Sequence, residues 1–282
     1  MIGQHLNTTE VQRQAIQAAV DETKSAPERN RLGQFATPYA LAVEIARFVC
    51  SLMDPRSGGI RFADPSIGSG SFFSAALAVF GPKHIESAVG IELDPVFANA
   101  ARDLWSAAGL EVTCGDFTRV VAGGSCPPAP NLILANPPYV RHHHMHREDK
   151  ERLQRLAYQM TGVEVNGLAG LYVYFLLLAT AWMKDGGYAA WLIPSEFMDV
   201  NYGAALKRYI TDRVTLIRAH RFDPDEVQFS DALVSSVVLV FQKFPPPPGH
   251  EPEFPFRATL KEPHASDRLT LAHPRASHKW PI

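Results

Sequence analysis

The sequence alternates short apolar runs with helical segments, and this alternation constrains the fold more than any other feature. IRFAD (60–64), AVGIELD (88–94), LEVTCGD (110–116) and NLILA (131–135) have the length and composition of buried strands. The helical stretch SFFSAALAVF (71–80) separates the first two. Strands that alternate with helices form right-handed crossovers within a parallel sheet. We therefore predict an α/β fold, with helices on both faces of a mostly parallel sheet.

Helices are also expected before the first strand and after the fourth. Thr8 to Lys24 has helical spacing, with Asn7 or Thr8 as its N-cap, and Tyr39 to Met53 forms a second helix behind Pro38. The elements predicted after the fourth strand are helices at about 148–160 and 171–184 and strands at 188–194, 214–220 and 233–241. From Phe244 onward the pattern of apolar residues typical of core elements ends and prolines are frequent. This indicates an extended linker or surface strap.

Composition places the chain among ordinary globular proteins. Hydrophobic residues make up 46% and charged residues 20% of the 282 positions, enough for a large core. The longest apolar stretch, 171–183, is too short to span a bilayer, and the N-terminus lacks the features of a signal peptide. The three cysteines have no CxxC spacing, so neither a disulfide framework nor a zinc site is indicated. We expect a cytoplasmic protein without a membrane segment.

The overall charge gives no sign of a nucleic-acid binder, but one segment does. The formal net charge is -2, whereas RHHHMHREDKERLQR (141–155) holds five Arg or Lys, three acids and four histidines. A local positive field of this kind suits a segment that touches a nucleic-acid backbone. Neighbouring histidines in a polar segment point in different directions, so we predict no metal site here.

The residues directly after the fourth strand form a rigid corner. Pro137 and Pro138 cannot donate to a sheet ladder and fix their own φ angles, so the chain must leave the sheet in an extended form. Open α/β sheets bind ligands outside the carboxyl ends of their strands. This places Asn136 and Tyr139 where chemistry is expected.

The turns after the first three strands carry a second set of candidate binding residues. DPSIGSGSF (64–72) puts glycines between a strand and a helix, where a ligand can approach the backbone, although a tight structural turn is equally expected from this feature alone. Glu92 ends the next strand, where such folds place an acid on ribose hydroxyls. Asp116 and Phe117 offer an acceptor and a ring for an adenine, but singly they are more typical of a cap and a core residue.

Together these motifs carry a family resemblance over roughly residues 30–243. GQFATP, DPSIGSGSF, GIELDP, GDF and NPPY stand in the order and approximate spacing of the gamma-class N6-adenine DNA methyltransferases. The resemblance implies a Rossmann-like methyltransferase fold with a seven-stranded, mostly parallel sheet and S-adenosylmethionine as the cofactor. It also implies a role in a restriction-modification or related defence system. The residues it assigns to cofactor binding are Thr37, Asp64, Ser66, Gly68, Gly70, Glu92, Leu93, Asp116 and Phe117.

The resemblance assigns catalysis to Asn136, Pro137, Pro138 and Tyr139, and the chemistry explains why. The exocyclic nitrogen of adenine is a poor nucleophile because its lone pair is delocalised into the ring. If the Asn136 carboxamide oxygen and the Pro137 carbonyl both accept hydrogen bonds from that amine, the lone pair is freed for in-line attack on the sulfonium methyl group.

The target base must also leave the duplex, at a cost of a few kcal/mol. Aromatic stacking returns roughly 1–3 kcal/mol per base. We expect Tyr139 to supply one ring. By its spacing before the last strand, Phe229 is the candidate for the second, and an ordinary anchoring role for Phe229 is equally expected.

Other functions fit parts of the same pattern. NPPY also occurs in methyltransferases that act on release-factor glutamine, ribosomal RNA adenine is a further acceptor, and a non-catalytic cofactor-binding subunit is possible. GQFATP and the long segment after NPPY favour DNA.

The predicted domain organisation lacks a complete target-recognition domain. We predict an N-terminal helical extension at 1–30, a catalytic domain at 31–243 and a proline-rich tail at 244–282. The tail is too short for target recognition. We therefore expect a specificity subunit or second polypeptide as a partner, in addition to DNA, or else a truncated gene product.

Overall fold

The computed structural model describes residues 2–25, 28–29, 32–53, 58–122, 128–222 and 235–253. Its strands form a seven-stranded sheet in the order β3-β2-β1-β4-β5-β7-β6. All neighbouring pairs from β3 to β5 are parallel, and β7 runs antiparallel to both β5 and β6. The strands are β1 (Ile60–Asp64), β2 (Ile85–Glu92), β3 (Leu110–Cys114), β4 (Leu132–Ala135), β5 (Tyr188–Pro194), β6 (Thr215–Arg221) and β7 (Ser236–Gln242).

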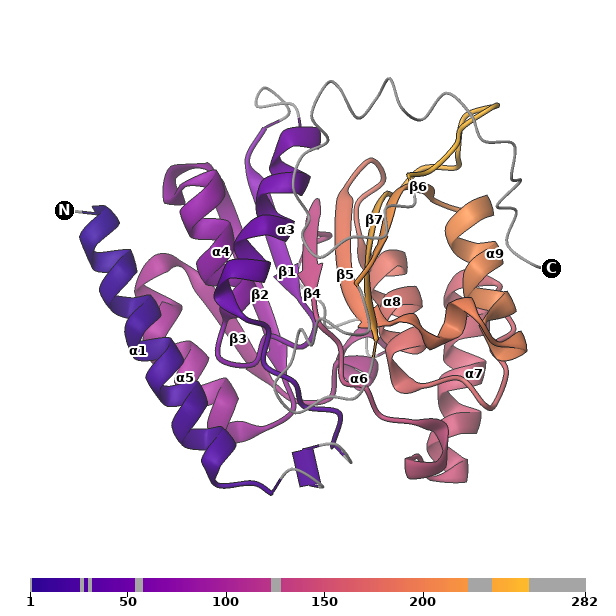
Figure 1. Cartoon of the computed structure of the whole chain (residues 1–282), viewed down its shortest axis with the longest axis horizontal. Helices are drawn as coiled ribbons and strands as arrows, with labels where there is room; N and C mark the ends of the chain where they lie inside the picture. Colours follow the sequence, from indigo (N-terminus) through magenta and orange to yellow (C-terminus); the bar gives the residue numbers. More distant parts are fainter. Residues whose placement is uncertain are drawn as a thin grey trace.

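Helices cover both faces of this sheet, as Figure 1 shows. The α-helices on one side are α1 (Ile2–Glu22), α3 (Tyr39–Leu52), α4 (Ser71–Phe80) and α5 (Pro95–Trp105); those on the other are α6 (Phe117–Ala122), α7 (Arg147–Thr161), α8 (Leu171–Trp182) and α9 (Ala204–Asp212). The short 3-10 helices are η1 (Pro82–His84), η2 (Ser106–Ala108), η3 (His142–His144), η4 (Ser195–Met198) and η5 (Asn201–Gly203). The predicted fold class is confirmed by this architecture.

Side-chain alternation along the strands divides the core into two layers. In β4, Leu132 and Leu134 pack with α3, α4 and α5, whereas Ile133 and Ala135 pack with α6, α7 and α8. Every residue of this strand is buried. A strand that is buried on both faces consists of consecutive apolar residues. NLILA has this pattern, so its sequence alone predicts a buried strand.

The sequence misplaces the start of the first helix. Helix α1 already begins at Ile2, so neither Asn7 nor Thr8 is its N-cap. The other predicted helices agree closely with α3, α7 and α8, and Pro38 occupies the N-cap position of α3. No helix in the described ranges is both long and apolar enough to cross a lipid bilayer.

The tail beyond β7 acts as a strap along the sheet edge as far as it is described. Glu253 N donates to Ile217 O at 2.9 Å, and Ala219 N donates to Glu253 O at 2.8 Å. These bonds cover part of the free edge of β6, which would otherwise present unpaired backbone groups.

Gly70 fixes the junction between the glycine turn and α4. Its φ is +94°, and a Cβ atom there would lie 2.4 Å from Nε1 of Trp105. That indole nitrogen donates to Ser69 O at 2.9 Å. Only a residue without a Cβ atom lets α5 pack this closely on the turn.

We expect Gly70→Ala to lower the free energy of unfolding by at least ~2 kcal/mol, because it adds a steric clash to the strain of a left-handed backbone. Gly109→Ala is the matched control, since Gly109 has φ +90° and open space around its Cβ position. It should cost only ~1 kcal/mol. Urea unfolding of both variants measures the difference, and equal losses would contradict the packing role.

Candidate functional site

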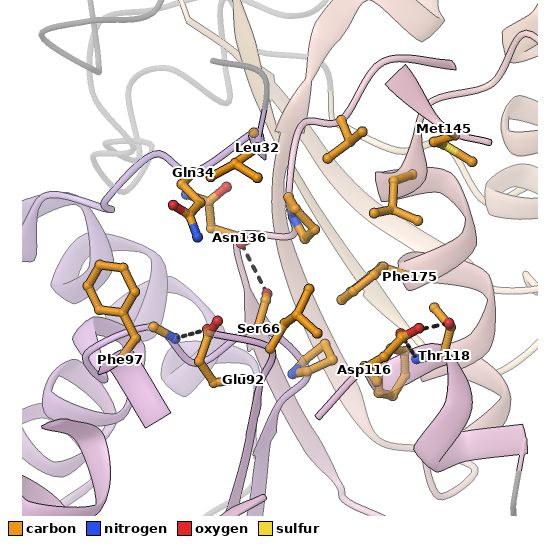
Figure 2. Close-up of a pocket in the computed structure, with 18 of the residues that line it drawn as sticks. Leu32, Gln34, Ser66, Glu92, Phe97, Asp116, Thr118, Asn136, Met145 and Phe175 are labelled. Carbon is orange, nitrogen blue, oxygen red and sulfur yellow. Dashed lines mark hydrogen bonds between the residues drawn. The ribbon is translucent and has the colours of Figure 1, made fainter. Parts of the chain in front are cut away.

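A pocket of about 410 Å³ opens at the carboxyl ends of β1 to β4. The chain proceeds from β1 to β2 and β3 on one side and places β4 on the other, so this is the switch point of the sheet. Figure 2 shows Ser66, Glu92, Asp116 and Asn136 around it. The predicted residues that line it are Ser66, Gly68, Glu92, Leu93, Asp116, Phe117, Asn136 and Pro138.

A smaller cavity of about 60 Å³ adjoins this pocket and shares Ser66, Gly68 and Asn136 with it. Thr37 and Asp64 line only the smaller cavity. Predicted residues from five separate segments of the sequence therefore meet at one edge of the sheet.

The glycine turn is held in place by two carboxylates. Asp64 Oδ1 accepts from Ser66 N at 2.9 Å, and Glu92 Oε2 accepts from Gly68 N at 2.9 Å. The other Glu92 oxygen, Oε1, accepts from Asp94 N at 2.9 Å. Each acid thus closes a turn and also contributes to the lining of a cavity.

Burial shifts the pKa of both acids upward. Burial raises the pKa of Asp64 to about 8, the negative charge of Glu92 adds to the shift, and the hydrogen bonds from Ser66 oppose it. Burial also raises the pKa of Glu92, against the backbone hydrogen bonds from Asp94 and Gly68. The glycine turn therefore lies over carboxyl groups that are costly to ionise without a cation nearby.

Asn136 lies in the pocket with its side-chain amide anchored at one end. Its Nδ2 donates to Phe35 O at 2.9 Å and to Thr37 Oγ1 at 3.0 Å. Because a backbone carbonyl can only accept, the NH2 group must face Phe35. Oδ1 of Asn136 is buried and has no hydrogen-bond partner among the residues that the structure describes. A buried amide oxygen with no partner is rare in folded proteins, and a catalytic role is one of the reasons for which such an atom is kept.

The backbone of Asn136 is tied to the glycine turn. Ser66 Oγ donates to Asn136 O at 3.0 Å, as the dashed line in Figure 2 shows. The segment after β4 and the turn after β1 therefore form one connected unit.

The remaining residues of the NPPY corner alternate between the pocket and the interior. Pro138 and Val140 line the pocket, whereas Pro137 and Tyr139 are buried. An extended segment sends successive side chains to opposite sides, which explains the alternation. The alternation is consistent with the extended form that the sequence predicts for the segment with Pro137 and Pro138.

Tyr139 is not among the residues that line the pocket. Its hydroxyl donates to Leu192 O at 3.2 Å, and its ring packs 5.4 Å from that of Phe35. Burial raises the pKa of the phenol. In this structure Tyr139 anchors the corner to β5. Its ring, which the sequence predicts to stack on the target base, does not line the pocket. Phe229, the second expected ring, lies outside the described residues.

Asp116 and Phe117 line the pocket and also have structural roles. Asp116 Oδ1 accepts from Thr118 N at 2.8 Å, and its Oδ2 lies 3.6 Å from Nη2 of Arg152. Phe117 is 1% exposed, and its ring packs 5.2 Å from that of Phe175. Asp116 thus has the cap role and Phe117 the core role that the sequence indicates for each residue singly. Both residues also line the pocket.

Helix α1 contributes pocket residues that the sequence analysis missed. Gln17 and Asp21 line the pocket, Arg13 Nη1 donates to Ser69 Oγ at 3.0 Å, and that hydroxyl donates to Gln17 Oε1 at 2.8 Å. Glu10 pairs with Arg13 in a buried contact of 2.7 Å. Positions 10, 13, 17 and 21 have helical spacing, so this polar stripe could have been recognised in the sequence.

The histidine-rich segment contributes the opposite wall. His144, Met145 and His146 line the pocket at the end of η3, and Asp149 and Arg152 follow on α7. The contact between this segment and a nucleic-acid backbone, expected from the sequence, stays a prediction. In the described part of the chain, no cluster of three or more His, Cys, Asp or Glu could hold a metal ion.

Sequence comparison relates the chain to DNA methyltransferases of restriction-modification systems. Residues 131–228 match the Eco57I restriction-modification methylase family. The Type II methyltransferase M.XamI of Xanthomonas campestris pv. amaranthicola is 30% identical over 218 residues, which cover 75% of this chain and 39% of that protein. M.AccI of Acinetobacter calcoaceticus, also a Type II methyltransferase, is 25% identical over 237 residues, which cover 83% of this chain and 41% of that protein. The chain thus spans well under half of the length of these relatives.

Structure comparison agrees on the fold. A putative class I S-adenosylmethionine-dependent methyltransferase from Listeria monocytogenes superposes with a TM-score of 0.68 at 15% identity, covering 93% of this chain and 77% of that one. The chain therefore has the class I S-adenosylmethionine-dependent methyltransferase fold.

Asp64 should make stability fall as the pH rises. Its pKa is about 8 in the folded chain and close to 4 in the unfolded chain. Between these values the folded state retains a proton that the unfolded state has lost, so raising the pH favours unfolding. The contribution is fully present below pH 4 and is lost as the pH approaches 8.

The measurement compares wild type with Asp64→Asn by urea unfolding at pH 5.5 and pH 8.5, without cofactor. Asparagine keeps an oxygen that can accept from Ser66 N but has no charge to lose. Wild type should lose more stability than the variant between the two pH values. Parallel losses in the two proteins would show that Asp64 ionises without penalty.

Proposed function

We propose that this chain, which is related in sequence to restriction-modification DNA methyltransferases, is the catalytic part of an S-adenosylmethionine-dependent enzyme that methylates N6 of adenine in DNA. The observation that carries this proposal is the buried Asn136 Oδ1, which lacks a partner while the NH2 group of the same amide is held by two acceptors. An amide held in this way presents an acceptor to an incoming amine.

The residues present fit S-adenosylmethionine. The pocket of about 410 Å³ is large enough for a nucleoside with an amino-acid chain. Glu92, Asp116 and Asp21 supply carboxylates along its wall, which suits ribose hydroxyls and a cationic group. We propose that Ser66, Gly68, Glu92, Leu93, Asp116 and Phe117 hold the cofactor, with Thr37 and Asp64 beside its amino-acid end. Gly70 acts indirectly, by shaping the turn.

The cofactor supplies an electrophilic methyl group when bound, and the chain supplies orientation and activation. Asn136 Oδ1 accepts a hydrogen bond from the exocyclic amine and draws its lone pair out of conjugation with the ring. The carbonyl of Pro137 is proposed as the second acceptor, on the segment that the two prolines stiffen. Preorganised acceptors need no reorganisation during the reaction, which is the main source of their catalytic effect.

The acceptor base must reach this pocket outside a duplex. An adenine at the carboxyl ends of the strands is accessible only if it is flipped out of the DNA stack. Pro138 and Val140 offer apolar surface next to Asn136. Stacking by Tyr139 would require Phe35 or the corner itself to move, because the Tyr139 ring is buried against Phe35.

Target recognition is proposed to come from elsewhere. The chain spans about two fifths of the length of its curated relatives, and the residues that read a DNA sequence are proposed to lie on a further segment or on a partner such as a specificity subunit. We also propose that the protein works in the cytoplasm. In this proposal, residues 31–243 are the catalytic domain, supported by α1, and residues 244–282 form the tail.

The activity is tested by incubating the full chain with labelled S-adenosylmethionine and duplex DNA, single-stranded DNA, ribosomal RNA or release factor in parallel. We expect label in DNA, recovered as N6-methyladenine after digestion to nucleosides. Label recovered as N4-methylcytosine would overturn the adenine assignment, and label in RNA or release factor alone would overturn the DNA assignment.

Asn136→Ala should lower kcat for methyl transfer by ~100-fold or more, while the affinity for the cofactor stays close to that of wild type. Steady-state kinetics and calorimetric titration with S-adenosylhomocysteine separate the two effects. Asn99→Ala, an equivalent truncation at an exposed position of α5, is the control and should behave as wild type. Full turnover by Asn136→Ala would end the proposed mechanism.

A further inference from the structure

The segment 33–37 runs alongside the NPPY corner and contacts it repeatedly. Gly33 O accepts from Tyr139 N at 3.0 Å, and the Phe35 ring packs against Tyr139. A Cβ atom at Gly33, where φ is +65°, would lie 2.3 Å from Tyr139 N. Glycine is therefore required for the two backbones to approach this closely.

The same segment holds the Asn136 side chain by its nitrogen. The two amide protons have two acceptors, Phe35 O at 2.9 Å and Thr37 Oγ1 at 3.0 Å. Turning the amide over would set Asn136 Oδ1 against the Phe35 carbonyl, where two acceptors would face each other, whereas the Thr37 hydroxyl can either accept or donate. The Phe35 carbonyl therefore selects the orientation in which Oδ1 has no partner among the described residues, and the Thr37 hydroxyl holds that orientation by accepting the second amide proton.

Thr37 is itself fixed to the cofactor side of the site. Ser71 Oγ, in the first turn of α4, donates to Thr37 O at 2.9 Å. Thr37 is 7% exposed, so its hydroxyl has little freedom to turn toward solvent. A continuous path thus leads from the start of α4 through Thr37 to the Asn136 amide.

We propose that Thr37 is a positioning residue for methyl transfer: its hydroxyl, together with the Phe35 carbonyl, orients the Asn136 amide so that Oδ1 meets the amine of the target base. This inference rests on the proposed function. It gives Thr37 a role on the acceptor side of the reaction, in addition to the cofactor-side role expected from the sequence.

The orientation is tested without turnover by nuclear magnetic resonance of the Asn136 side-chain NH2 group. Its signals are identified by their loss in Asn136→Ala. In Thr37→Val, which keeps the branched shape but has no acceptor, one amide proton should shift and exchange faster with water. Thr37→Ser should restore the wild-type signals. Unchanged signals in Thr37→Val would refute the proposed contact.

The effect on the reaction is tested with the same variants of the full chain. Loss of one neutral hydrogen bond should lower kcat about tenfold in Thr37→Val, with affinity for S-adenosylhomocysteine retained, and Thr37→Ser should recover most of the rate. Urea unfolding checks that the variants are folded.

The outcomes separate this inference from the proposed function. If Thr37→Val weakens cofactor binding and leaves kcat unchanged, Thr37 serves the cofactor alone and the inference fails. If wild type transfers no methyl group even to a saturating concentration of single-stranded DNA, where neither base flipping nor target recognition limits the reaction, the proposed function fails, and the resonance experiment still decides how the amide is held.

Discussion

The site depends on how one side-chain amide is held. Asn136 follows a fully buried strand, its backbone carbonyl is bound by Ser66, and its NH2 group is bound by Phe35 and Thr37. These contacts come from the turn after β1 and from the segment before α3, so the amide joins parts of the chain that are about 70 to 100 residues apart. Such a residue cannot move without disturbing the glycine turn. Its unpaired oxygen is a cost in stability that a bound amine would remove.

Helix α1 extends this arrangement to the outer wall of the pocket. Arg13 and Gln17 both contact Ser69 in the glycine turn, and Lys24 Nζ lies 2.7 Å from Oδ2 of Asp94, which caps α5. Burial of the ion pair between Arg13 and Glu10 has a desolvation cost. The additional hydrogen bond from Arg13 to Ser69 Oγ helps to offset that cost. The N-terminal helix is therefore integral to the pocket.

The sequence predicts the fold well because its signals are local. Continuous apolar strands, glycines at strand-to-helix turns and prolines after β4 each act within a few residues. The gathering of Asp64, Ser66, Glu92 and Asn136 at one edge follows from the parallel order of the strands alone. The start of α1 at Ile2 and the buried position of Tyr139 were not predictable, because packing against distant elements decides both. The tyrosine side chain alternates inward only because the corner stays extended and β5 offers the Leu192 carbonyl.

The most direct measurement is a crystal structure of the chain with S-adenosylhomocysteine and a DNA oligonucleotide that carries an unpaired adenine. We expect the exocyclic amine to lie within hydrogen-bond distance of Asn136 Oδ1, while Nδ2 keeps its bonds to Phe35 and Thr37. An adenine bound with its amine away from Asn136, or an Asn136 amide turned so that Oδ1 faces Phe35, would contradict this expectation.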